Sequence, residues 1–230
     1  MNAGRVAWLV GAYLAGTFPS AYLVARLTGA REVVAAARSG VSEGDAHVLI
    51  DKHVGKGWGT VAAALDVLKG FAYAFVANTV PHLPPGWLAA VGVLLVVGHC
   101  FPPYLRSMAG RGLSAAAGVL LALLPLGMVV AGVVIVLGYA MRATGPASTL
   151  GFALTPIVAL AQGAAGPIAA MGGSIFGVIL LRRLVGVSEA AARSGWPRAL
   201  VRRLVFDADL PAPATGAAGA EQPHHRPIGP

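Results

Sequence analysis

Long apolar runs, separated by short polar or proline-rich stretches, dominate the pattern of this chain up to residue 184. They number about seven, at 6–27, 58–80, 87–104, 113–124, 126–139, 147–162 and 166–181. Several approach the ~20 residues that a helix needs to cross about 30 Å of hydrocarbon. No stretch shows the period of two that predicts a half-buried strand. The pattern predicts an all-α polytopic membrane protein with about seven transmembrane helices.

The pattern changes after residue 184. Residues 187–208 are predicted to form a basic amphipathic segment on the membrane surface. Within it, residues 196–206 interleave arginine with leucine and valine, which is typical of a short basic helix. Residues 209–230 are rich in proline, alanine and glycine without an apolar period, which predicts a disordered tail. Residues 1–186 are predicted to form one membrane-embedded domain. Within it, spacings such as Gly173 and Gly177 fit close helix packing.

Composition strengthens the membrane assignment and excludes other classes. The 230 residues are 57% hydrophobic and 11% charged, with a mean hydropathy of +0.73, whereas a soluble domain carries about 25% charged residues. The single cysteine, Cys100, excludes an intrachain disulfide and a cysteine-based metal site. The net charge of +8 is spread between apolar runs, so orientation signals and anionic ligands explain it better than nucleic acid does.

Basic residues alternate between the ends of the runs and so predict the orientation. If the N-terminus lies outside, Arg5 is outside, and the other basic residues of the loops and run ends up to 183 lie inside: Arg26, Arg31, Arg38, Lys52, Lys56, Arg106, Arg111, Arg142, Arg182 and Arg183. Lysine and arginine are enriched in cytoplasmic loops. We therefore expect the N-terminus outside, and the C-terminus and the loops at 31–57 and 106–112 in the cytoplasm.

Three ionisable side chains lie inside the predicted spans. Asp66 and Lys69 are three residues apart and share one helix face, where each charge costs at least ~2.5 kcal/mol on insertion scales. Either they neutralise each other, or Lys69 also faces a polar cavity that holds an anion. His99 is either a donor in helix packing or a catalytic group. Cys100 points about 100° away from it and is interpreted as a packing residue.

Two loops place a basic residue between glycines directly before a helix, at Gly55–Gly57 and Gly110–Gly112. Glycines let the backbone approach a ligand, and the following helix directs free amides at it, so such a loop can bind phosphate. Membrane orientation alone also explains basic loops on the inner side. A third loop, SGVSEG at 39–44, lies on the same predicted side. The convergence of three loops and His99 favours a phosphate site.

Three segments resemble a known family: GTFPSAYLVAR at 16–26, LDVLKG at 65–70 and GHCFPPYLRSMAGRGLSAAAGVLLAL at 98–123. They resemble the bacterial acyl-phosphate-dependent glycerol-3-phosphate acyltransferases, the PlsY family, over about residues 6–184. The resemblance implies a multi-pass enzyme of the bacterial cell membrane with its site on the cytoplasmic face. Such an enzyme moves an acyl group from acyl phosphate to glycerol 3-phosphate and forms lysophosphatidic acid for phospholipid biosynthesis. Membrane lipids are its other expected partners, and no metal or organic cofactor is implied.

The resemblance also assigns residues in the first family loop, which reads GSGNxGATNxxR. Ser39, Gly40 and Gly44 match that loop. His47 stands where its second asparagine would be, and Lys52 is the nearest candidate for its arginine. These residues are therefore expected to bind substrate, and Ser39 is a candidate catalytic hydroxyl.

Other family positions are matched with changes. Gly110, Arg111 and Gly112 stand where the family has glycine, lysine and glycine, and Thr17 stands for the serine of GSIP. The third family motif, similar to RHRENI, reads LLRRLVGV at 180–187. Thr17, Gly110, Arg111 and Gly112 are assigned to substrate binding, and Arg111 is expected to lie in a water-accessible loop.

In the resulting hypothesis, Arg111 and Lys69 bind phosphates, while Ser39 and the neighbouring amides donate to a phosphate or to the carbonyl oxyanion. His99 orients the glycerol hydroxyl or acts as its base. A catalytically reduced relative that binds lipid precursors or partners without turnover is the alternative. A small transporter comes third, although no convincing internal repeat supports it.

The orientation can be tested with new cysteines, because Cys100 is the only native thiol. In a Cys100→Ser background, single cysteines at Ser39, Ser107 and Ala214 should react with a membrane-impermeant thiol reagent only after the cells are opened. Labelling of any of the three in intact cells would contradict the orientation.

Overall fold

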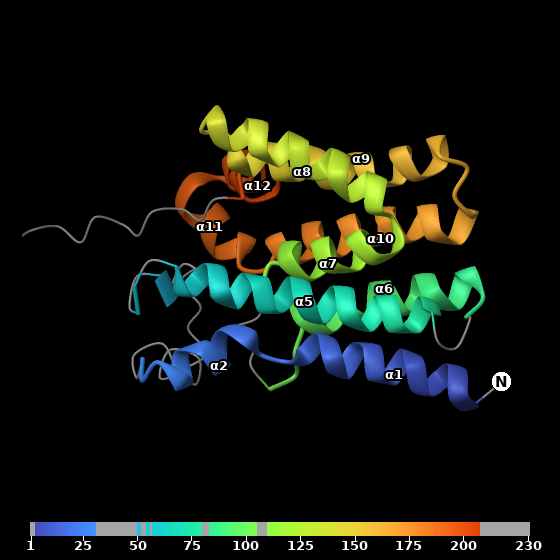
Figure 1. Ribbon diagram of the computed structural model, residues 1–230. Coiled ribbons are helices and arrows are strands. Elements are labelled where there is room, and N and C mark those ends of the chain that lie inside the picture. The colour runs from blue at the N-terminus through green and yellow to red at the C-terminus, as the bar shows by residue number, and fades with distance from the viewer. Residues whose placement is uncertain are drawn as a thin grey trace, which may run out of the picture.

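Helices make up all the regular secondary structure within the described part of the chain (Figure 1). The computed structural model describes residues 3–30, 50–51, 54–55, 57–79, 83–104 and 110–207. In chain order the helices are α1 (Ala3–Thr17), α2 (Ser20–Leu27), α5 (Trp58–Thr79), α6 (Pro85–Cys100), α7 (Leu113–Leu123), α8 (Pro125–Ala140), α9 (Thr144–Ala161), α10 (Gly166–Arg183), α11 (Val187–Ser194) and α12 (Trp196–Leu204). The predicted all-α class is confirmed over these residues.

Two to four candidate membrane spans lie within the described residues. Helices α5 and α9 are each long and apolar enough to cross a membrane, and the bent pairs α1 with α2 and α10 with α11 qualify if each pair counts as one span. Helices α6, α7 and α8 are apolar but shorter. With 11 residues, α7 is only about 17 Å long and covers part of a hydrocarbon layer.

Proline divides two of the apolar runs. The run predicted as one helix at 6–27 is instead two helices, α1 and α2, bent by 41°. Pro19 lacks the N–H that would continue the helix, and its ring disfavours a helical backbone at Phe18. The division predicted at Pro125 is present, and there the proline opens α8 at a position where its missing N–H is harmless.

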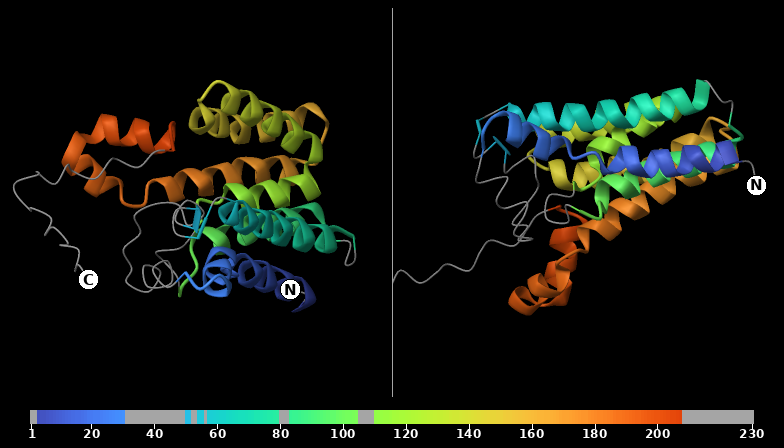
Figure 2. Two further views of the ribbon diagram at one scale, coloured as in Figure 1. Left: turned by 60° about the vertical axis from the view of Figure 1, so that its left-hand side comes forward. Right: turned by 90° about the horizontal axis from the view of Figure 1, so that it is seen from below.

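A short helical hairpin follows the bundle at the end opposite to the N-terminus (Figures 1 and 2). The sequence predicts one basic helix at 196–206, and the structure has two, α11 and α12. Gly186 and Gly195 lie at their N-termini with φ values of 79° and 80°, which glycine adopts without strain. The hairpin protrudes from the bundle in both views of Figure 2.

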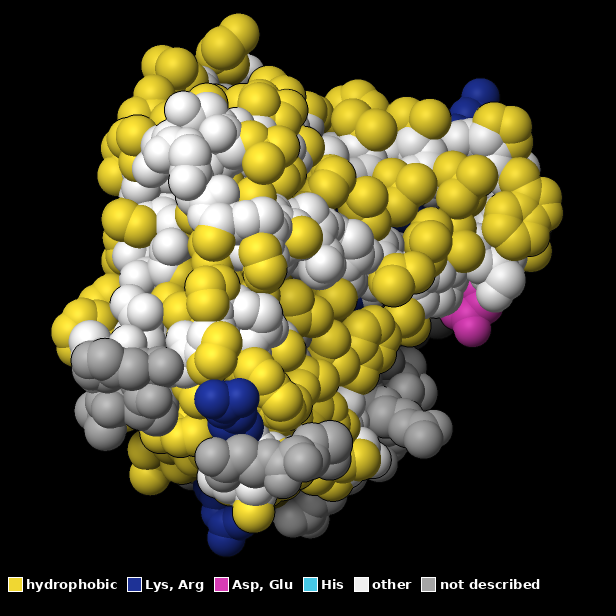
Figure 3. Space-filling view, turned by 90° about the vertical axis from the view of Figure 1, so that its right-hand side faces the viewer, with side chains coloured by type: hydrophobic (Ala, Val, Ile, Leu, Met, Phe, Trp, Pro, Cys, Tyr) yellow, Lys and Arg dark blue, Asp and Glu magenta, His cyan; other side chains and the backbone are white. Residues whose placement is uncertain are grey.

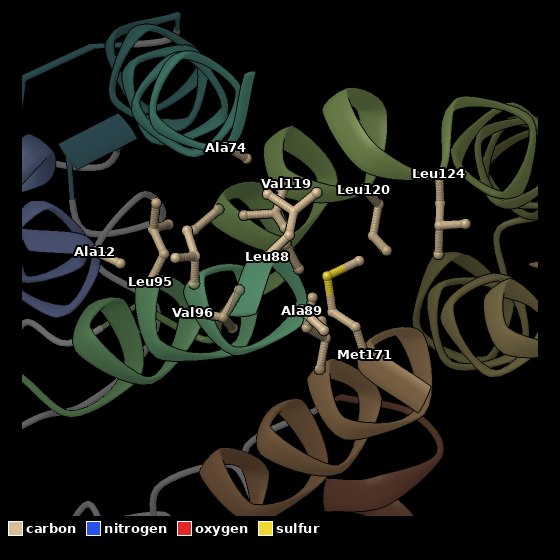
Figure 4. Close-up of a cluster of buried hydrophobic side chains, with 14 of the residues drawn as sticks. Ala12, Ala74, Leu88, Ala89, Leu95, Val96, Val119, Leu120, Leu124 and Met171 are labelled. Carbon is tan, nitrogen blue, oxygen red and sulfur yellow. The ribbon is translucent and has the colours of Figure 1, made fainter. Parts of the chain in front are cut away.

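One apolar cluster packs between α1, α5, α6, α7 and α10 (Figure 4). Its buried members include Ala12 of α1, Leu95 of α6, Val119 and Leu120 of α7, and Met171 of α10. Helix α7 contacts both α5 and α10 as well as α6 and α8. The short α7 therefore lies inside the bundle, and the loop that precedes it is held by several helices.

Helices cross closely where glycines face each other. A β-carbon at Gly16 of α1 would collide with the backbone of α6, and one at Gly98 of α6 would collide with the backbone of α1. Gly70 and Gly118 form the same reciprocal contact between α5 and α7. Such contacts let membrane helices gain van der Waals packing without an apolar driving force between them.

The glycines that the sequence spacing predicts to pack closely are not those that lie at these helix crossings. Gly173 and Gly177 have no other group within 4 Å of a β-carbon position, so the expectation that they mark close packing is wrong. A four-residue spacing places two glycines on one face of a helix, but it does not identify which face meets a neighbour.

Large apolar side chains also cover the outside of the bundle. On the face shown in Figure 3, hydrophobic side chains predominate and charged ones are few. More than half of the surface of Leu14, Leu68, Val136, Ile157 and Leu181 is exposed in each case. Apolar surfaces this extensive mark contact with a membrane or another apolar partner.

The α1–α6 crossing predicts opposite effects for two glycine substitutions. Gly98→Ala should destabilise the protein by about 1–3 kcal/mol or more, because the new methyl group collides with the α1 backbone. Gly132→Ala in α8 meets open space and should be neutral or stabilising by about 0.5–1 kcal/mol. Thermal unfolding of detergent-purified variants measures both. Equal losses would contradict the crossing.

Candidate active site

A buried carboxylate, that of Asp66 in α5, is the centre of the first polar cluster. Asp66 is 2% exposed. Its Oδ1 accepts a 2.7 Å hydrogen bond from the hydroxyl of Ser20 and lies 2.7 Å from Nζ of Lys69. The ion pair that the three-residue spacing suggests is therefore formed, and α2 supplies a neutral donor to the same oxygen.

Lys69 connects this carboxylate to two other parts of the bundle. Its Nζ donates a 2.7 Å hydrogen bond to the carbonyl oxygen of Phe18, at the break between α1 and α2, and lies 3.1 Å from Nδ1 of His99. An ammonium group carries three donors, and Asp66, Phe18 and His99 account for three contacts. Mutual neutralisation of Asp66 and Lys69 is thus built into the fold.

His99 of α6 is buried, with protein groups at both edges of its ring. Its Nδ1 lies 3.1 Å from Nζ of Lys69 and 3.5 Å from Oδ1 of Asp66. A β-carbon at Gly110 would collide with Nε2, so the backbone of Gly110 lies against that edge. This geometry suits a residue that positions the Gly110–Gly112 loop better than a base that must reach a substrate hydroxyl.

The hydroxyl that joins the cluster is not the one that the sequence suggested. Thr17 is buried, but its Oγ1 donates to the carbonyl of Leu14 in its own helix over 2.7 Å. Its carbonyl oxygen accepts a 2.6 Å hydrogen bond from the Tyr104 hydroxyl. Ser20, three residues later and beyond the Pro19 break, faces Asp66 instead.

A second polar cluster forms around Asp207. Its Oδ1 lies 2.9 Å from Nη1 of Arg111 and 3.2 Å from Nε of Arg183. Arg183, only 3% exposed, also donates from Nη1 to the hydroxyl of Thr149 over 2.6 Å and from Nη2 to that of Ser148 over 3.3 Å. Its Nε lacks hydrogen-bond geometry toward Asp207, so that contact is purely ionic. A cation this deeply buried needs an anion close by.

The loop Gly110–Gly112 connects the two clusters. The Gly110 backbone packs on His99, while Gly112 has a φ of 93° and would place a β-carbon 2.7 Å from Sγ of Cys100. Glycine is therefore the residue that fits at both positions. Cys100 is fully buried in the apolar core. Between the two glycines, Arg111 directs its guanidinium to the second cluster.

Arg111 is less accessible than the sequence suggested. Its side chain is 20% exposed and therefore only partly accessible to water. The cause is Asp207, 96 residues later in the chain, whose carbonyl oxygen also accepts a hydrogen bond from Arg111 Nη1. Arg182 donates a 3.3 Å hydrogen bond from Nε to the carbonyl of Gly110 and holds the same loop from α10.

The other glycine-basic-glycine loop, at 55–57, meets a carboxylate as well. Oδ1 of Asp51 accepts hydrogen bonds from the backbone N–H of Gly57 at 3.2 Å and of Gly59 at 2.8 Å. These amides belong to the N-terminus of α5, where a phosphate would otherwise bind. Asp51 therefore acts as the anion for this helix end. Lys56, the basic residue of this loop, lies outside the described residues.

Part of the predicted site lies outside the described residues. This applies to every residue assigned in the first family loop: Ser39, Gly40, Gly44, His47 and Lys52. Among the residues that the structure does describe, no group of three or more His, Cys, Asp or Glu side chains is arranged to hold a metal ion.

Sequence reasoning missed the partners that only the fold brings together. Ser20 follows the GTFP motif directly and could have been found as the hydroxyl closest to the helix break. The sequence predicts that Arg183 is an orientation signal at a helix end, yet its side chain is buried. Nothing in the local sequence around Asp207 indicates that it meets Arg111.

Known proteins resemble this chain over most of its length. The sequence profile of the family described as "Glycerol-3-phosphate acyltransferase" matches residues 6–189. "Glycerol-3-phosphate acyltransferase 4" of Dehalococcoides mccartyi is 35% identical over 109 residues, which are 47% of this chain and 56% of that protein. "Glycerol-3-phosphate acyltransferase" of Dechloromonas aromatica is 31% identical over 153 residues, which are 66% of this chain and 75% of that protein.

A solved structure has a similar fold. It is the glycerol 3-phosphate form of PlsY (YgiH), described as an integral membrane glycerol 3-phosphate acyltransferase. The TM-score is 0.69 at 22% sequence identity, and the match covers 83% of this chain and 94% of that one. The likeness shows that the two chains share a fold.

The buried ion pair predicts a non-additive mutant cycle. Asp66→Asn leaves Lys69 without its carboxylate and should destabilise the protein by roughly 3–5 kcal/mol. Adding Lys69→Met removes the uncompensated charge, so the double variant should regain most of this loss. Thermal unfolding in detergent measures the cycle. If the two effects simply add, the charges do not stabilise each other.

Proposed function

The chain belongs to the glycerol-3-phosphate acyltransferase family, and from this premise we propose that it forms lysophosphatidic acid from acyl phosphate and glycerol 3-phosphate. The observation that carries the proposal is the placement of Arg111. It is fixed between two glycines that pack on His99 and Cys100, and its guanidinium meets the same carboxylate oxygen as that of the buried Arg183. Two guanidinium groups facing one point match the oxygens of a phosphate.

The proposed reaction needs no acyl-enzyme intermediate. The primary hydroxyl oxygen of glycerol 3-phosphate attacks the carbonyl carbon of acyl phosphate, the bond from that carbon to the phosphate oxygen breaks, and phosphate leaves. The hydroxyl proton passes to a substrate phosphate. The protein then has to neutralise two phosphates and hold the reacting groups close together. In this proposal Arg111 and Arg183 bind one phosphate.

The Asp66 cluster is assigned to positioning. Lys69 and His99 hold the backbone of the Gly110–Gly112 loop in place through the contacts described above. Ser39 with Gly40 and Gly44 is proposed to bind the other phosphate and the carbonyl oxyanion, with His47 and Lys52 nearby, as the family resemblance implies.

An apolar cavity next to the second cluster suits the acyl chain. Its volume is about 400 Å³, and it lies between α7, α8 and α9. Its lining is mostly apolar and includes Leu113, Met128, Ile135 and Phe152, and Asp207 is part of its wall. A mostly apolar cavity next to an ionic cluster matches an acyl phosphate, which has an apolar and an ionic part.

The proposal includes the place of the enzyme in the cell. The apolar helices would cross or enter the bacterial cell membrane as about seven segments, with the site on the cytoplasmic face. Residues 187–208, with the exposed side chains of Trp196, Arg198 and Val201, would lie on the inner membrane surface. The predicted tail at 209–230 lies outside the described residues.

Formation of lysophosphatidic acid by the purified protein, given acyl phosphate and glycerol 3-phosphate, tests the function. Product above a no-enzyme control is expected. Its absence, from folded protein, would favour a relative that binds lipid precursors without turnover.

Substitution of Arg111 tests the assigned residue. Arg111→Ala removes a charge-assisted contact, so kcat/KM should fall about ten- to a hundredfold. Arg111→Lys keeps the charge without the planar fork and should retain most of the activity. Arg142→Ala, at the exposed turn between α8 and α9, is the matched control and should have no effect. Full activity per molecule in Arg111→Ala would refute the phosphate assignment.

A further inference from the structure

The α11–α12 hairpin continues beyond the family match. That match ends at residue 189, whereas α11 and α12 reach Leu204 and the described chain continues to Asp207. The last four of these residues return to the bundle and contact α9, α10 and the loop before α7. A feature of this chain outside the matched region therefore reaches the proposed active site.

The carboxylate of Asp207 lies where the proposed function places a phosphate. Its Oδ1 is within 3.2 Å of guanidinium nitrogens of both Arg111 and Arg183. We propose that these two arginines form the binding site for one substrate phosphate, and that Asp207 occupies this site as an internal competitor that phosphate displaces. The inference rests on the proposed function, because it assigns the occupant of the same site.

A phosphate can replace Asp207 because it satisfies the same cations with more charge. A carboxylate carries one negative charge and two oxygens, whereas a phosphate monoester carries nearly two charges and three terminal oxygens. Arg183 is almost fully buried and must keep an anion. The exchange leaves this requirement satisfied throughout, so release of Asp207 does not leave the arginine unpaired.

The segment that carries Asp207 is held by contacts that can be broken together. The carbonyl oxygen of Leu204 accepts hydrogen bonds from Arg183 at 2.7 Å and Thr149 at 3.3 Å. The backbone of Phe206 packs against Gly145, where a β-carbon would collide with it. Asp207 itself has a φ of 51°, a left-handed conformation that costs free energy in a residue other than glycine. Release of the segment relieves this strain.

The same segment also borders the acyl cavity. Phe206 and Asp207 both line it, so displacement of the carboxylate by a phosphate moves a wall of the cavity. The phosphate and the acyl chain of an acyl phosphate would thus both compete with this segment for space. This contiguity favours acyl phosphate over glycerol 3-phosphate as the ligand that displaces the segment.

The first experiment measures phosphate affinity in the full-length protein in detergent, by isothermal titration with inorganic phosphate. Asp207→Asn should lower the Kd at least fivefold, and adding Arg111→Ala should abolish this gain. Glu189→Gln is the matched control: it removes the same charge from an exposed position in α11 and should leave the Kd unchanged. An unchanged or higher Kd in Asp207→Asn would overturn the proposal.

A second experiment uses the natural sequence and does not depend on the stability of a variant. Hydrogen exchange of the amides in 201–207 should become faster, at least threefold, when phosphate or an acyl phosphate is added at constant ionic strength with chloride. Slower or unchanged exchange would show that the segment stays in place and would refute displacement.

The two experiments separate this inference from the proposed function. Both experiments measure ligand binding or its structural effect, and neither measures turnover. If lysophosphatidic acid is not formed but Asp207→Asn still binds phosphate more tightly, the acyltransferase assignment fails and the internal competitor stands. If lysophosphatidic acid is formed and neither experiment shows displacement, the acyltransferase assignment stands and the internal competitor is refuted.

Discussion

A charge buried in an apolar helix bundle has to be compensated by neighbouring groups, and this constraint organises the rest of the structure. Asp66 illustrates it, because its carboxylate meets a hydroxyl from α2 and an ammonium from its own helix. Lys69 in turn reaches Phe18 and His99. Three segments that are distant in sequence, at 18–20, 66–69 and 99, thereby meet in one cluster. The cost of breaking any single contact in it exceeds that of breaking a surface ion pair.

The ion cluster around Asp66 also determines where the Gly110–Gly112 loop lies, because His99 contacts the backbone of that loop. His99 meets the backbone of Gly110 on one side and Lys69 on the other. A larger residue at position 110 would push the loop away from α6. Through these two glycines, the position of Arg111 depends on the ion cluster, to which the proposed function assigns a positioning role. Substituting lysine by arginine at this position keeps the charge but adds a directional requirement, which Asp207 fulfils.

Much of the fold, and less of the site, could be predicted from the sequence. Runs of apolar residues and Pro125 located most helices because length and proline act locally. The pairing of Asp66 with Lys69 was predictable for the same reason, since three residues on a helix fix a shared face. The contact of Asp207 with Arg111 was not predictable, because it forms only after a hairpin has turned the chain back, whereas Ser20 could have been found from its place directly after the GTFP motif. The four-residue spacing gave a wrong prediction at Gly173, because a small residue packs closely only where a neighbouring helix approaches it.

The chain supplies a carboxylate at both of its glycine-basic-glycine loops, and the two cases differ in a way that bears on function. Asp51 receives the amides of the α5 N-terminus and lies only a few residues away in sequence, so it is a local cap that forms with the helix. Asp207 meets guanidinium groups from a distant hairpin and in a left-handed conformation. A local cap is lost only when its helix end unfolds, whereas a distant and strained contact is exchanged for a better anion without disturbing the helices. The arginine loop is therefore the one of the two at which ligand exchange is physically feasible.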